Sequence, residues 1–245
     1  MLISLDYRNE TVLSSIEKLW RSVAPTWAWP RRDPYQAEYS WAFDQLMASV
    51  DGSLAGKKVM DAGGGGGAFQ HVVAAAGADV LNVDVIPTLH KSKFAVPTKQ
   101  HCAALDATEL EEGSFDGIVS VSSIEHNEWS GILNIARHLL GLLKPGAALV
   151  LTFPAGEYEQ WIPEGSWPLP HQAKWPKCYF FDEACARRLV AHVADLAELK
   201  TPARWFGEEY RAIWRDQHKD MITNSRPQAR YPYLSAGLVF VRRTA

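Results

Sequence analysis

The stretch Lys57-Lys58-Val59-Met60-Asp61-Ala62-Gly63-Gly64-Gly65-Gly66-Gly67-Ala68-Phe69 decides the fold of this 245-residue chain. A short apolar run ends at Asp61, and five consecutive glycines separate it from an apolar pattern with helical spacing. The helical pattern consists of Phe69, Val72, Val73 and Ala76. This order predicts a strand, a tight turn and a helix. Glycines suit such a turn because it needs backbone conformations that a Cβ atom forbids, and because the main chain must approach its ligand closely. The stretch therefore predicts a nucleotide-binding turn.

Two ligand classes fit this turn. The spacing Gly63-x-Gly65-x-x-Ala68 fits the dinucleotide fingerprint of NAD(P)-dependent oxidoreductases. The spacing Asp61-x-Gly63-x-Gly65-x-Gly67 resembles the first motif of class I S-adenosylmethionine (SAM)-dependent methyltransferases. Asp61 favours the second class, because a carboxylate at the end of the first strand crowds a pyrophosphate but suits a ligand with an ammonium group and a sulfonium. The resemblance covers residues 55 to 155 and is only loose elsewhere.

Acidic residues follow the next two predicted strands. Asp84 ends the strand at 78–85, about 20 residues after the first glycine, where one carboxylate can accept hydrogen bonds from both ribose hydroxyls. The resemblance implies that Asp84 holds the ribose of SAM and that Asp106, followed by Ala107, accepts from the adenine amino group. A solvated strand-end carboxylate at Asp84 and a helix cap at Asp106 are the alternatives.

The loop after the fourth predicted strand, 114–121, is expected to face the Asp61 turn. In an open parallel sheet, ligands bind outside the carboxyl ends of the strands near the point where the strand order reverses. The sequence FDGIVSVSSIEH resembles the fourth-strand region of small-molecule methyltransferases. It lacks the Asn/Asp-Pro-Pro-Tyr motif of enzymes that methylate nucleic-acid amino groups. The complete set of cofactor-binding residues that we expect is Asp61, Gly63, Gly65, Gly67, Asp84, Asp106, Ala107 and Ser122.

The order of the patterns predicts one α/β domain with a doubly wound, seven-stranded, mostly parallel sheet and an antiparallel last strand. At 245 residues, with 47% hydrophobic residues, the chain is long enough for one such domain with a sizeable core. The expected parts are an N-terminal helical cap (1–54), a SAM-binding core (55–153), a lid insertion after the fifth strand (154–181), and a C-terminal helix and strands (182–245).

The segment 154–181 is rich in proline and tryptophan and is too long for a simple connection. It leaves the carboxyl end of the fifth strand, so we expect a substrate lid with aromatic walls from Trp161, Trp167 and Trp175. A purely structural aromatic flap is the alternative. The same alternatives, lining the site or packing on the sheet, apply to Tyr35, Tyr39 and Trp41 of the cap.

The expected activity is transfer of a methyl group from SAM to an oxygen or nitrogen of a small molecule. A hydroxyl acceptor must lose a proton, and His126 and His171 are the candidate bases, because the unperturbed pKa of histidine is about 6.5. Alignment of the acceptor without a side-chain base is an alternative. No metal is expected. An NAD(P)-dependent oxidoreductase and a noncatalytic SAM-binding module are the alternative functions.

Composition limits the partners and the compartment. The net charge of -3 and the isoelectric point of about 6.2 give no global positive field for nucleic acid or an anionic membrane. The cysteines, Cys102, Cys178 and Cys185, are too scattered for a disulfide framework and are expected to be free thiols in a cytoplasm. No stretch reaches the ~20 apolar residues of a membrane span. We expect a cytoplasmic enzyme with a small-molecule substrate; the sequence does not determine its oligomeric state.

Overall fold

A computed structural model describes residues 2–3, 10–23, 34–86, 94–156, 159–164, 176–201 and 234–244 of the chain. In sequence order the elements are β1 (Leu2–Ile3), α1 (Glu10–Val23), α2 (Pro34–Ser49), β2 (Lys58–Ala62), α3 (Phe69–Ala75), β3 (Asp79–Asp84), β4 (Lys99–Cys102), β5 (Phe115–Val121), the 3-10 helix η1 (Ile124–His126), α4 (Trp129–Leu142), β6 (Leu143–Ala155), β7 (Gln160–Ile162), β8 (Cys178–Phe180), α5 (Glu183–His192), β9 (Ala197–Leu199) and β10 (Leu234–Arg242).

The main sheet has the order β1-β10-β6-β5-β2-β3-β4. Strands β4, β3, β2, β5 and β6 run parallel to one another, and β10 runs antiparallel to β6 from the pair Leu234↔Ala155 to the pair Val241↔Ala148. Strands β9 and β1 both pair antiparallel with β10. The predicted doubly wound α/β fold with an antiparallel last strand is confirmed. The short β1 adds an eighth strand to the seven that the sequence predicted.

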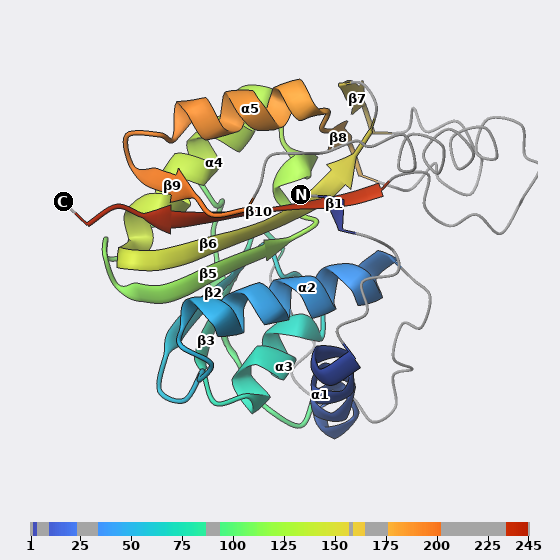
Figure 1. Cartoon of the computed structure of the whole chain (residues 1–245), viewed down its shortest axis with the longest axis vertical. Helices are drawn as coiled ribbons and strands as arrows, with labels where there is room; N and C mark the ends of the chain where they lie inside the picture. Colours follow the sequence, from blue (N-terminus) through green and yellow to red (C-terminus); the bar gives the residue numbers. More distant parts are fainter. Residues whose placement is uncertain are drawn as a thin grey trace, which may run out of the picture.

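Helices cover both faces of this sheet. Figure 1 shows α1, α2 and α3 on one face and α4 and α5 on the other. Alternate residues of β6 follow this division: Ala148 and Val150 pack in the core with the first three helices, whereas Leu149 and Leu151 pack in the core with α4 and α5. Both faces of the central strands are therefore buried, which explains why their sequences are apolar almost without interruption.

One strand boundary differs from the sequence-based prediction. Strand β6 was expected to begin at Ala147 but begins at Leu143. Its register with β5 shifts between the pairs Phe115↔Leu143 and Gly117↔Ala148, and Gly146 has a φ of 82°. The Pro-Gly step thus makes a bulge inside the strand and does not end it.

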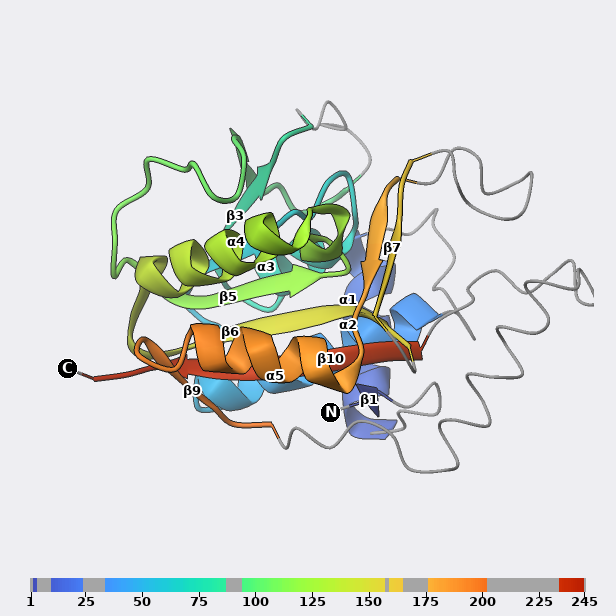
Figure 2. The same cartoon turned by 90° about the horizontal axis from the view of Figure 1, so that it is seen from above.

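A β-hairpin stands apart from the main sheet. Strands β7 and β8 pair antiparallel, and Figure 2 shows them rising beyond the carboxyl end of β6. The hairpin is joined to the main sheet by a bridge between Ala155 and Phe181. The described part of the predicted lid insertion is therefore regular structure placed at the edge where ligands are expected.

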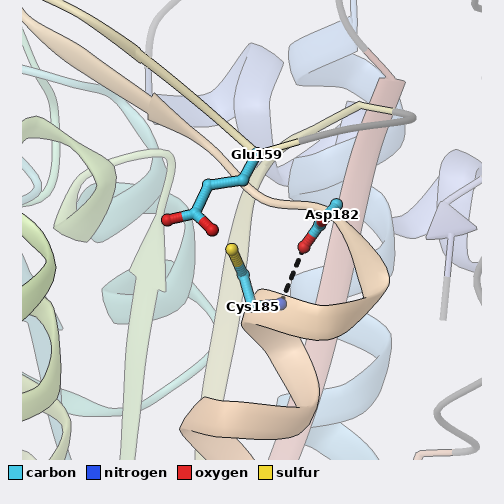
Figure 3. Close-up of side chains that lie close together, drawn as sticks. All are labelled: Glu159, Asp182 and Cys185. Carbon is cyan, nitrogen blue, oxygen red and sulfur yellow. Dashed lines mark hydrogen bonds between the residues drawn. The ribbon is translucent and has the colours of Figure 1, made fainter.

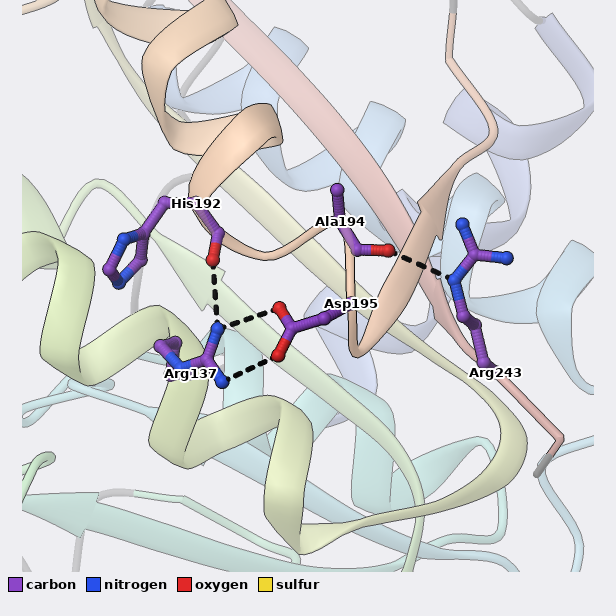
Figure 4. Close-up of polar contacts among 5 residues, drawn as sticks. All are labelled: Arg137, His192, Ala194, Asp195 and Arg243. Atoms are coloured by element: carbon purple, nitrogen blue, oxygen red, sulfur yellow. Dashed lines mark hydrogen bonds and ion pairs between the residues drawn. The ribbon is translucent and has the colours of Figure 1, made fainter.

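A polar cluster fastens α4 to the turn between α5 and β9. Arg137 donates to both oxygens of Asp195, at 2.7 and 2.8 Å, and to the carbonyl of His192 at 2.8 Å, as Figure 4 shows. The hydrogen bond from Arg137 lowers the pKa of Asp195 to about 2. Arg243 donates to the carbonyl of Ala194 and ties the end of the chain to the same turn. In the ranges described above, no helix is long and apolar enough to cross a bilayer.

Candidate active site

The glycine turn lies at the carboxyl end of β2, beside the loop that follows β5. Gly63 and Gly65 have φ values of 77° and 50°, in the left-handed region that favours glycine. A Cβ atom on Gly63 would lie 1.7 Å from the Ser123 hydroxyl, so only glycine allows this close approach. The predicted strand, turn and helix are confirmed, and the turn faces the β5 loop, as expected at the carboxyl ends of strands in an open parallel sheet.

Asp84 ties the end of β3 to the glycine turn. Its Oδ2 atom accepts from the amide of Gly65 at 2.9 Å, and its Oδ1 atom accepts from the amide of Ile86 at 2.8 Å. Each carboxylate oxygen can accept a second hydrogen bond. Asp84 is thus held in one orientation while each oxygen keeps acceptor capacity for a ligand hydroxyl.

Two side-chain amides, neither singled out in the sequence-based prediction, hold the carbonyl of Gly65, and a third supports them. The Gly65 carbonyl accepts from Nδ2 of Asn82 at 2.9 Å and from Nε2 of Gln70 at 3.1 Å. Asn82 also donates to Gln100 at 2.7 Å, and Gln100 and Thr98 both donate to Gln70. The buried polar positions at Gln70 and Asn82 were the available signal, because a polar residue inside an apolar helix or strand needs a partner.

Asp61 lies beneath the turn, and its side chain is only 4% exposed. A Cβ atom on Gly64 would lie 2.4 Å from its Oδ2 atom, so the main chain of the turn runs directly over the carboxyl group. Burial, and secondarily the charge of Asp84, raise the pKa of Asp61 to about 7. A cationic group of a ligand near this position would favour the ionised form of Asp61.

The loop after β4 reaches the same edge. Asp106 and Ala107 are exposed, and the amide of Ala107 donates to the carbonyl of Ala104 in a tight turn. A Cβ atom on Gly63 would lie 3.7 Å from Leu105, so this loop borders the glycine turn. The proposed contact of Asp106 with an adenine stays a prediction.

Ser122, at the end of β5, belongs to a buried polar group centred on Glu38 of α2. Ser122 has a φ of 46°, and its hydroxyl donates to Glu38 Oε2 at 2.5 Å. The hydroxyls of Thr152 and Ser235 donate to the same carboxylate, at 2.9 and 2.5 Å. Glu38 is fully buried and joins α2 to β5, β6 and β10. The predicted cofactor contact of Ser122 is untested, and its hydroxyl already has this partner.

The helix η1 places two titratable residues side by side. Glu125 is 2% exposed, and burial raises its pKa well above the usual value. His126 is half-buried, and its Nδ1 atom lies 2.7 Å from the carbonyl oxygen of Lys177, just before β8. Burial lowers the pKa of His126, and Asp84 lies close enough to oppose that shift. One predicted base candidate is therefore at the sheet edge, between the glycine turn and the hairpin.

Aromatic side chains fix the hairpin to α4. Tyr179 lies 5.6 Å from Trp129 and 6.0 Å from Trp161, and Phe181 stacks on Phe153 at 4.1 Å between ring centroids. Trp161 is partly buried against this cluster. The role of Trp161 in a substrate wall stays a prediction, because a substrate lid and a structural flap would both allow these contacts.

Glu159, Asp182 and Cys185 lie together where the hairpin meets α5, as Figure 3 shows. Asp182 caps the helix α5 by accepting from the Cys185 amide at 2.7 Å. Glu159 accepts from the Tyr179 hydroxyl and from Arg188 at 3.0 Å. Burial raises the pKa of the Cys185 thiol to about 12, so it stays protonated at neutral pH, whereas metal ligation requires the thiolate. These contacts serve helix capping and hairpin attachment.

The aromatic residues of the N-terminal cap have different positions. Trp41 is fully buried, and its ring lies against Gly237 of β10, where a Cβ atom would come within 2.3 Å. Tyr39 stacks on Phe69 at 5.2 Å, and its hydroxyl lies 3.9 Å from the position of a Cβ atom on Gly67. Trp41 thus packs on the sheet, whereas Tyr39 borders the glycine turn. His171, Trp167, Trp175 and the side chain of Tyr35 lie outside the described residues.

Curated proteins that are similar in sequence to this chain are named as O-methyltransferases. Ubiquinone biosynthesis O-methyltransferase of Chromobacterium violaceum is 33% identical over 101 residues, which are 38% of this chain and 43% of that protein. The protein of the same name from Xanthomonas campestris pv. campestris (strain B100) is 32% identical over 116 residues, 44% of this chain and 47% of that protein. The chain therefore matches less than half the length of these curated relatives.

Solved structures share the fold. The 1,6-didemethyltoxoflavin-N1-methyltransferase of Burkholderia thailandensis superposes with a TM-score of 0.59 at 14% identity, over 96% of this chain and 89% of that one. The magnesium protoporphyrin IX methyltransferase of Synechocystis PCC 6803, solved with SAM, gives 0.53 at 17% identity, over 99% and 96%. A family model described as "Methyltransferase domain" matches residues 35–199, from α2 to β9. Because this match covers more than half of the chain and confirms the resemblance of its motifs, the chain belongs to the methyltransferase-domain family.

Proposed function

We propose that this protein transfers a methyl group from SAM to an oxygen or nitrogen of a small molecule. The observation that carries the proposal is the Asp84 carboxylate, which is fixed at the end of β3 by the Gly65 amide and keeps acceptor capacity on both oxygens. Such a carboxylate suits the two hydroxyls of a ribose. The buried Asp61 beneath the same turn suits the positive charges of SAM better than a pyrophosphate.

Methyl transfer from SAM requires mainly that the protein align the cofactor and the acceptor. The sulfonium of SAM activates the methyl group for an in-line displacement, and holding the two reactants in line can supply about 7–11 kcal/mol of the barrier. In this proposal Asp61, Asp84 and the glycine turn hold SAM, and the β5 loop and the hairpin position the acceptor. The relatives are named as O-methyltransferases and a structural neighbour as an N1-methyltransferase, so both acceptor atoms belong to the proposal.

Calorimetry with the purified chain tests the cofactor. We expect SAM and S-adenosylhomocysteine to bind, and NADH to produce no heat of binding. Binding of NADH without SAM would favour the oxidoreductase alternative, which the family match does not support. Mass spectrometry of the purified protein for a retained nucleoside is an independent measurement of the same point.

Methyl transfer is tested by incubating a metabolite extract with the protein and with SAM that carries a labelled methyl group. We expect at least one labelled small molecule with a mass gain of one methylene. Binding of SAM without any labelled product in extracts from several sources would favour the noncatalytic module.

The cytoplasmic location belongs to the same proposal and is supported by free thiols at Cys102, Cys178 and Cys185.

A further inference from the structure

The hydrogen bond at Nδ1 of His126 determines which nitrogen of this side chain carries a lone pair. The partner at 2.7 Å is the carbonyl oxygen of Lys177, which can only accept. The neutral imidazole must therefore carry its proton on Nδ1, and Nε2 must carry the lone pair. A histidine in this tautomer can accept a proton only at Nε2.

His126 lies at the same edge of the sheet as the glycine turn. His126 is the last residue of η1. Ser123, directly before this helix, lies against Gly63 of the glycine turn. No hydrogen bond joins Nε2 to another residue of the described ranges, and the side chain is half-buried. His126 thus has one nitrogen fixed by the hairpin, and its other nitrogen has no hydrogen-bond partner among the described residues.

Burial is the main reason why the His126 side chain stays neutral. Burial lowers its pKa below the usual 6.5, and the charge of Lys177 acts in the same direction, whereas Asp84 and the Lys177 carbonyl oppose them. The adjacent Glu125 and the Cys178 thiol of β8 are both buried, which raises their pKa values and disfavours their charged forms. The imidazole is therefore unprotonated at neutral pH, as a general base must be.

We propose that His126 is the general base of an O-methylation and that the acceptor is a phenolic hydroxyl. The inference rests on the proposed SAM-dependent activity and specifies its acceptor. Nε2 takes the hydroxyl proton, and an oxygen lone pair forms the new bond to the methyl carbon. The bond from that carbon to sulfur breaks, and its electron pair stays on sulfur. The products are a methyl ether, S-adenosylhomocysteine and an imidazolium, which returns its proton to water.

A phenol fits these residues better than an aliphatic alcohol. A phenolic pKa is near 10, within reach of an imidazole, whereas an aliphatic alcohol is far less acidic. The ammonium of Lys177 lies 5.9 Å from the centre of the Trp161 ring, so an aromatic surface and a positive charge lie together beside the His126 anchor. The charge stabilises a developing phenolate, and the ring packs against an aromatic acceptor.

The test compares His126→Asn with the unmodified protein on phenols of graded acidity. The asparagine amide can still donate to the Lys177 carbonyl but has no basic nitrogen, so it keeps the anchor and removes the base. We expect single-turnover methylation of 4-methoxyphenol to slow by about 10²–10⁴-fold, the usual loss for a general base. The loss should be far smaller for 4-nitrophenol, which is largely ionised at pH 8 and needs no base. His138→Asn, on α4 with its Nε2 bonded to Thr108, is the matched histidine control.

The pH profile separates a base from a positioning residue. In the unmodified protein the rate for 4-methoxyphenol should rise through an apparent pKa below 6.5 and then level off; in His126→Asn that titration should disappear. An equal loss for all phenols, with the titration retained, would overturn the proposal and leave His126 a positioning residue. SAM binding without methylation of any phenol would overturn it while the cofactor site stands. Absence of SAM binding would instead contradict the proposed function.

Discussion

Asp84 and Gly65 are joined by a hydrogen bond of 2.9 Å between the Asp84 carboxylate and the Gly65 amide, 19 residues apart in the sequence. The bond crosses from the end of β3 to the turn after β2, so it fixes two parts of the proposed cofactor site with respect to each other. Loss of this carboxylate should therefore affect both the ligand contact and the shape of the turn.

We expect Asp84→Ala to weaken SAM binding by about tenfold to a thousandfold. The physical reason is the loss of charge-assisted hydrogen bonds, each worth about 1.5–3 kcal/mol. Titration calorimetry measures the change. Asp79→Asn, at the exposed start of the same strand, is the control and should bind SAM as the unmodified protein does. An unchanged affinity for SAM in Asp84→Ala would remove Asp84 from the site.

Asn82→Leu should weaken SAM binding by roughly tenfold, or about 1.4 kcal/mol. Leucine has nearly the same size but cannot donate to the Gly65 carbonyl or to Gln100. The Gly65 carbonyl would then keep only the bond from Gln70, and the turn would be less well fixed before the ligand binds. Calorimetry at one temperature and salt concentration tests this. Equal affinities would show that the amide group serves folding alone.

Asp61 should make the free energy of unfolding depend on pH. Its pKa is raised from 3.8 to about 7 in the folded state, so between these values the folded protein holds a proton that the unfolded chain has released. Stability must therefore fall as the pH rises through this window. Urea unfolding at pH 5 and pH 7 should show a decrease on the order of 2 kcal/mol that is absent in Asp61→Asn. A variant with the same pH dependence as the unmodified protein would contradict the assignment.

SAM affinity should rise with pH between pH 5.5 and 7 if Asp61 faces the positive groups of the cofactor. A cation near the carboxyl group favours its ionised form, so below a pKa of about 7 binding must first remove the proton. Calorimetry in two buffers of different ionisation enthalpy would detect the released proton. In Asp61→Asn the proton release should vanish, and a release that persists there would assign it to another group.

Glu38→Ala should lower the free energy of unfolding by about 3 kcal/mol, because it leaves the hydroxyl of the partly buried Ser122 and those of the buried Thr152 and Ser235 without their acceptor. Glu38→Gln keeps one acceptor oxygen and should cost less. Urea denaturation measures both. Glu128→Ala, at an exposed position before α4, should change stability by less than about 0.5 kcal/mol. A cost for Glu38→Ala no larger than this control would mean that the hydroxyls find other partners.

The sequence by itself determined seven of the eight strands of the main sheet, the glycine turn, and the positions of Asp61, Asp84 and the β5 loop at one edge of the sheet. These features are local: apolar periodicity reports which residues are buried, and parallel strands must bring their carboxyl ends to the same edge. The motifs of residues 57–69 and 114–126 were also sufficient for the resemblance that the family match confirms.

Only the tertiary structure decided which polar side chains meet. Glu38 finds its hydroxyl partners 84, 114 and 197 residues away, and His126 receives its tautomer from a carbonyl 51 residues later. Neither pairing follows a periodic sequence pattern, because both depend on how α2 and the hairpin pack against the sheet. A polar residue inside an apolar segment signals that a partner is needed, but only the packed fold determines which group supplies it.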